Sequence, residues 1–150
     1  MIRKSGLIVT LLCALGLMLP LGAQNVSTAT FFGGAILGDP SGFQGGAGLG
    51  FGITHNVSFE PSFAIGRTGN TNVFTLDGVF DYNFHLQHGQ PIPYILGGVG
   101  LAQYDNSTHG SPIVGGGVRF PISDGWQIRP EIRWGTHGLS RFTIGLTKTF

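Results

Sequence analysis

The sequence has 150 residues, a length typical of one domain, and only 10% of them are Asp, Glu, Lys or Arg. A soluble domain usually carries roughly 25% charged residues, so the composition disfavours an ordinary soluble protein. The eight Lys and Arg nearly balance the seven Asp and Glu, which excludes the strongly basic surface of a nucleic-acid-binding protein.

The first residues have the pattern of an export signal. Arg3 and Lys4 precede an apolar run, Leu7 to Leu19, and Ala23 offers a small residue for cleavage. The run is shorter than the ~20 residues of a membrane-spanning helix, which favours a cleaved signal over an uncleaved anchor. We therefore predict a signal peptide over residues 1–23 and an exported domain over residues 24–150. That domain has no cysteine, so an oxidising compartment would give it no disulfide.

From residue 28 onward, the sequence divides into short alternating runs separated by turn residues. The runs cover residues 28–38, 43–54, 57–67, 72–86, 93–104, 112–122, 126–134 and 141–150. Their lengths are near the roughly 9–11 residues of a tilted membrane strand, and none shows the 3.6-residue period of a helix. The pattern predicts an all-β protein, an eight-stranded antiparallel up-and-down transmembrane β-barrel.

The alternation also predicts which side of each strand faces outward. In the run 72–86, Phe74, Leu76 and Phe80 share one face, and Asp77 and Asp81 share the other. Across the runs, the second face is built mainly from Gly, Ser and Thr, whereas the exterior of a soluble barrel would carry many Lys and Glu. We therefore predict that the apolar face contacts lipid and the polar face lines the lumen. A soluble, lipocalin-like barrel with an apolar interior is the alternative.

The last run adds a more specific pattern. Phe142, Ile144 and Leu146 occupy alternate positions, and the sequence ends on the aromatic residue Phe150. Together with the signal peptide and the alternating strands, this pattern resembles the outer-membrane β-barrel domain family typified by OmpA and OmpX. The resemblance implies that these four residues form an assembly signal, with outer-membrane lipid and the barrel-assembly machinery as partners. Lys148 departs from the family pattern, although a lysine near the membrane interface can extend its charge into water.

Charged residues recur on the polar face of several predicted strands. They are Glu60, Asp77, Asp81, Arg119, Arg129, Glu131 and Arg133. Charges buried inside a narrow barrel are costly unless they pair, so we predict a network of salt bridges that closes the lumen. Glycines on the same face of runs 43–54 and 112–122 would leave room for the long arginines. A gate or an ion path is the functional alternative.

Two further features concern the shape of the barrel. Pro61 and Pro130 fall inside predicted strands, and because proline lacks an N–H, each is expected to mark a β-bulge. The connections at 55–56 and 123–125 look shorter than the others, which predicts that they lie on the periplasmic side together with both termini.

Catalytic and metal-binding signals are weak. Outer-membrane lipid A deacylases use a histidine and a serine near the C-terminal end, as His137 and Ser140 are placed here, but that family spaces the two one residue closer. His85 and His88 make a weak metal pair. We therefore predict no enzyme activity and no cofactor. The predicted function is a structural or surface-interaction role in the bacterial envelope, with a narrow pore and a lipid-modifying enzyme as alternatives.

Overall fold

The computed structural model describes residues 26–85, 90–104, 107–135 and 140–150. The predicted signal peptide, His88 and His137 lie outside the described residues. No helix within the described residues is long and apolar enough to span a membrane.

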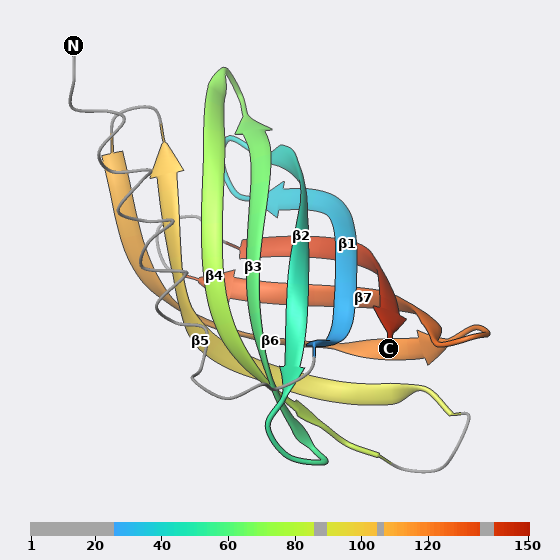
Figure 1. The fold of residues 1–150 in the computed structure, drawn as a ribbon. Helices are drawn as coiled ribbons and strands as arrows, with labels where there is room; N and C mark the ends of the chain where they lie inside the picture. The colour runs from blue at the N-terminus through green and yellow to red at the C-terminus, as the bar shows by residue number, and fades with distance from the viewer. Residues whose placement is uncertain (1–25, 86–89, 105–106, 136–139) are drawn as a thin grey trace.

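The chain forms a closed antiparallel barrel of eight strands, which confirms the predicted fold class (Figure 1). The strands are β1 (Val26–Leu37), β2 (Gly42–Gly52), β3 (Val57–Thr68), β4 (Thr71–Asn83), β5 (Ile92–Tyr104), β6 (Ser107–Pro121), β7 (Trp126–Gly135) and β8 (Ser140–Thr149). Each strand pairs with the next one along the chain, and β1 pairs with β8.

The seam between the first and last strands is continuous. The register from Thr28 opposite Thr149 to Leu37 opposite Ser140 has no shift. Inside the barrel, the hydroxyls of Thr30 and Thr147 are 2.9 Å apart and share a hydrogen bond. The seam therefore leaves no open sheet edge, and backbone groups at every strand find partners within the barrel.

The outer wall is apolar on every strand. Its large side chains that expose at least half of their surface include one or more from each strand, for example Phe31, Phe43, Phe63, Phe80, Val99, Val114, Trp134 and Ile144. A soluble barrel would bury such side chains in its core. The predicted outward direction of the apolar face is thus confirmed, and the soluble, lipocalin-like alternative is wrong.

Neither proline produces a bulge, so that prediction was wrong. The β3–β4 register continues through Pro61, which lies opposite Gly78, and the β7–β8 register continues through Pro130, which lies opposite Ile144. In an antiparallel ladder each residue directs its N–H toward one neighbour only, so a proline loses a single bond. Pairing lapses on one side of each proline and then resumes in the same register. The strand register shifts instead near Val26, between β1 and β2.

Connection length does not distinguish the two ends of the barrel, contrary to the prediction. At the end where β1 begins and β8 ends, called here the terminus end, the connections span 53–56, 84–91 and 122–125. At the opposite end, called here the distal end, they span 38–41, 69–70, 105–106 and 136–139. The distal connections are as short or shorter, so connection length does not indicate how the barrel is oriented in a membrane.

Candidate functional site

All the charged residues predicted for the lumen lie in the barrel interior, and the structure adds Arg141 to them. We call this group the interior charge network: Glu60, Asp77, Asp81, Arg119, Arg129, Glu131, Arg133 and Arg141. Seven of the eight are buried, and the Arg119 side chain is 12% exposed. Four carboxylates meet four guanidinium groups, so the network has no net charge.

The central contact of the network is a two-bond pair across the barrel. Arg129 on β7 donates from Nη1 and Nη2 to the two carboxylate oxygens of Glu60 on β3, at 2.5 and 2.7 Å. In a closed ring of eight strands, β3 and β7 are four places apart and so face each other across the lumen. The planar guanidinium matches a carboxylate in this geometry, which makes the pair both strong and directional.

Arg133 joins the central pair to the neighbouring carboxylates. Its Nε lies 2.5 Å from Glu131 Oε1, Nη1 lies 2.8 Å from Asp77 Oδ2, and Nη2 lies 3.1 Å from Glu60 Oε1. Arg129 also approaches Glu131, at 3.0 Å. These contacts distribute each buried charge over several partners, as a low-dielectric interior requires.

Arg141 completes the network and was missed from the sequence. It lies directly opposite Arg133 on the neighbouring strand, a placement that would be repulsive without a shared counter-charge. Asp77 Oδ2 supplies that charge, since Arg141 Nη2 approaches it at 2.7 Å and Arg133 at 2.8 Å. The period-2 pattern of β8 puts Arg141 on the same face as Thr143, so the signal was present in the sequence.

Tyr94 links the charged part of the interior to an apolar part. Its hydroxyl donates to Glu131 Oε2 at 2.5 Å, and its ring lies 4.7 Å from the guanidinium carbon of Arg119. Arg119 in turn pairs with Asp81 at 2.8 Å. The ring therefore stacks against one guanidinium while its hydroxyl bonds to a carboxylate of the network.

The interior is filled rather than open in its middle section. Beside Tyr94, the buried side chains of Val79, Leu96 and Ile113 form an apolar cluster. This cluster was not predicted from the sequence, because the glycines of the predicted fifth strand blur its alternation. With paired charges on one side and apolar contacts on the other, the geometry suits a closed lumen.

Gly117 provides the space that Tyr94 occupies. A Cβ atom at this position would lie 2.7 Å from the Tyr94 hydroxyl and closer still to the Pro130 carbonyl. We expect Gly117→Val to lower the free energy of unfolding by about 1–3 kcal/mol, the usual cost of overpacking. The matched control is Gly45→Val, where the nearest atom to an added Cβ is the Phe32 carbonyl oxygen at 3.6 Å, an ordinary contact distance.

The free energy of unfolding of both variants is measured by urea unfolding of the barrel in lipid vesicles. Equal stability of the Gly117 and Gly45 variants would contradict the packing argument.

The other predicted residues are placed as follows. Ser140 is the first residue of β8 and lies opposite Leu37. His85 stacks with His55, their ring centroids 4.8 Å apart. Among the described residues, no group of three or more His, Cys, Asp or Glu could hold a metal ion.

The predicted assembly residues lie on the outer wall. Phe142, Ile144 and Leu146 point outward on β8, and the Phe150 side chain is 77% exposed. Lys148 donates to the Asp124 carbonyl and lies 5.4 Å from the Trp126 ring, at the terminus end. This local contact explains how the outer wall accommodates a lysine where the family pattern has an apolar residue.

An apolar outer wall, a closed ring of eight antiparallel strands and a charged interior define the class of transmembrane β-barrels. Comparison with solved structures supports the same class. Neisserial surface protein A superposes with a TM-score of 0.63 at 15% identity, over 83% of this chain and 96% of that one. The N-terminal β-barrel domain of Pseudomonas aeruginosa OprF gives 0.59 at 16% identity, over 83% and 95%. Ail, the attachment invasion locus protein of Yersinia pestis, gives 0.55 at 16% identity, over 82% and 95%.

The chain therefore has the fold of the eight-stranded outer-membrane barrels, and the resemblance to OmpA and OmpX is confirmed at the level of fold. No family model matches the sequence, and no curated protein matches it.

Proposed function

We propose that the protein is a small integral barrel of the bacterial outer membrane, with a structural or surface-interaction role and a lumen that does not conduct. The observation that carries the proposal is the pairing of an apolar outer wall with a filled, ion-paired interior. The wall suits hydrocarbon, where only closed barrels and helices satisfy every backbone group. Two of the similar structures are named as a surface protein and an attachment protein, which supports a role at the cell surface.

The orientation follows from how such a chain enters the membrane. The start of β1 and the end of β8 lie at the same end, because the strand number is even. A protein exported to the periplasm can insert by passing its hairpins across while the termini stay behind. The terminus end then faces the periplasm and the distal end faces the cell exterior. Outer-membrane lipid and the barrel-assembly machinery are the partners that the proposal requires.

Membrane residence as a folded barrel is tested by fractionation and gel mobility. The exported protein is expected to sediment with outer membranes and to migrate differently before and after boiling, since a closed barrel resists detergent until heated. The same chain found soluble in the periplasm, without detergent, would rule out the proposal.

Conduction separates the proposed role from a narrow pore. One observation favours a pore. The Oδ1 atoms of Asp77 and Asp81 are buried and have no hydrogen-bond partner among the described residues. Such oxygens could coordinate a passing cation. Recording of single-channel currents in planar bilayers is expected to show a nearly silent protein. Steady conductance in every insertion would favour the pore instead.

The proposal includes no catalytic role. A lipid-modifying activity would need His137 and Ser140 to act together, and Ser140 is held at the start of a strand that pairs with β1. Incubation of the purified barrel with lipid A is expected to leave the acyl chains intact. Deacylation that is lost in both His137→Ala and Ser140→Ala would establish the enzyme alternative.

A further inference from the structure

One arginine on the outer wall is not part of the interior charge network. Among the described residues, the remaining Lys and Arg are Arg67 and Lys148, and both point outward. They lie at opposite ends of the barrel: Arg67 is near the end of β3 at the distal end, and Lys148 is near the end of β8 at the terminus end.

These two cations differ in their surroundings. Lys148 is held by the Asp124 carbonyl and the Trp126 ring. Arg67 is exposed, and no described residue forms an ion pair with it. An outward arginine at a membrane interface favours an anion as a partner, because its guanidinium offers several donors and always carries a charge.

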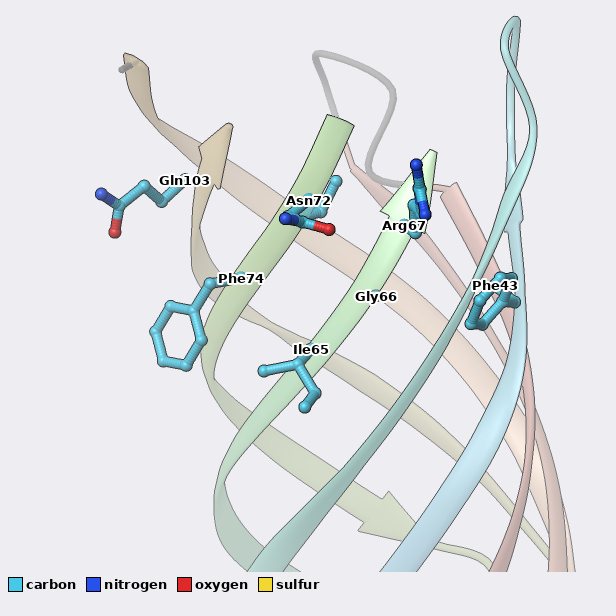
Figure 2. Close-up of a pocket in the computed structure, with 8 residues that line it drawn as sticks. Phe43, Ile65, Gly66, Arg67, Asn72, Phe74 and Gln103 are labelled. Carbon is cyan, nitrogen blue, oxygen red and sulfur yellow. The ribbon is translucent and has the colours of Figure 1, made fainter. Parts of the chain in front are cut away.

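Arg67 stands above a hollow in the outer wall (Figure 2). The hollow has a volume of about 590 Å³ and is lined by residues of β2, β3, β4 and β5. The strand register places Arg67 between Phe43 and Asn72 in one row, with Ile65 and Phe74 side by side in the next row toward the membrane centre. Polar groups thus lie at the rim, and apolar side chains lie below them.

We propose that this hollow binds a lipid with an anionic phosphate headgroup in the leaflet at the distal end. The guanidinium of Arg67 donates to the phosphate oxygens, and the amide of Asn72 lies beside it as a further donor. An acyl chain runs along Ile65 and Phe74, where it replaces contact with bulk lipid. The inference rests on the proposed membrane function, and it adds a particular ligand class and site to it.

The arrangement fits a lipid better than a second copy of the chain. A symmetric dimer through this face would bring two Arg67 side chains toward each other, and the outward lining of the hollow supplies no carboxylate to separate them. The apolar floor is also continuous with the lipid-facing wall of β3 and β4, where Phe63 and Phe80 are exposed. A lipid can use both parts of the site at once, with its phosphate at the rim and its chain on the floor.

Native mass spectrometry of the folded barrel in non-ionic detergent tests the proposal. The probes are bisphosphorylated lipid A and phosphatidylcholine, whose headgroup has no net charge. The wild type is expected to retain lipid A in preference to phosphatidylcholine. Arg67→Gln is expected to weaken lipid A binding about 5- to 10-fold, the effect of one basic group near a lipid surface.

Two further variants control for the charge at residue 67 and for the position of the cation on the barrel. Arg67→Lys keeps the charge without the planar donor pair and is expected to bind with intermediate affinity. Lys148→Gln removes the other outward cation and is expected to bind as the wild type does. Equal binding by the wild type and Arg67→Gln would overturn the proposal, as would an equal loss in Lys148→Gln or a dimer that forms in place of the lipid complex.

Heat-dependent gel mobility, measured on each variant first, separates this inference from the proposed function. A folded barrel that does not retain lipid A would contradict the lipid site alone. A wild-type chain that never forms a heat-modifiable barrel counts against the proposed membrane function.

Discussion

Replacing Arg129 by methionine should destabilise the barrel by about 3–5 kcal/mol, the cost of leaving a buried charge without its partner. Arg129 is 2% exposed and makes two hydrogen bonds to Glu60. Removing it leaves the Glu60 carboxylate with Arg133 alone, at 3.1 Å. Urea unfolding in lipid vesicles, followed by tryptophan fluorescence, measures the change.

The double variant makes the test specific to the ion pair. Glu60→Met alone should also be costly, because it leaves Arg129 dependent on Glu131 at 3.0 Å. With both residues replaced by methionine, the remaining network has three guanidinium groups and three carboxylates and is neutral again. The double variant should therefore be more stable than the sum of the two single changes predicts, by at least about 1 kcal/mol.

Conductance gives a second readout for the same variants. If the network closes the lumen, Arg129→Met should raise ion leakage above that of a nearly silent wild type. Lys148→Met, a change on the outer wall, should alter neither leakage nor stability. Additive effects in the double variant, together with unchanged leakage in Arg129→Met, would show that the network does not act as a plug.

The fold could be predicted because its main determinant is local. Period-2 alternation fixes which face each residue joins, so the strands and the apolar outer wall followed from the sequence. Strand ends were predicted less accurately, because residues typical of turns also occur inside strands. The stretch before Pro112 looks like a loop, yet β6 begins at Ser107 and pairs there with Tyr104. Likewise, β4 ends at Asn83, three residues before the predicted 86.

The interior was only partly predictable, because partners across a lumen are a property of barrel closure. The sequence placed Arg129 and Glu60 on polar faces, but only the strand order shows that β3 and β7 face each other. Tyr94 was missed for a different reason. Its strand contains glycines on both faces, so the sequence carried no clear signal that this aromatic residue points inward.

The last prediction concerns Phe150, whose side chain and backbone have separable roles. The Phe150 backbone N–H donates to the Ser27 carbonyl at 3.0 Å, which extends the β1–β8 seam. The side chain, in contrast, is 77% exposed, so the folded barrel gains little from packing it. We therefore expect Phe150→Ala to refold in detergent with the stability of the wild type, to within about 0.5 kcal/mol.

In cells the same variant should behave differently, if the resemblance to OmpA and OmpX extends to assembly. We expect Phe150→Ala and deletion of Phe150 to reduce the folded protein in the outer membrane severalfold and to leave degraded or periplasmic material. Phe150→Trp keeps an aromatic side chain and is the matched control, expected to assemble as the wild type does. Heat-dependent gel mobility of outer-membrane fractions measures the folded amount. Normal assembly of Phe150→Ala would place the signal elsewhere, whereas a loss of refolding in detergent as well would assign the side chain a role in stability and not in recognition.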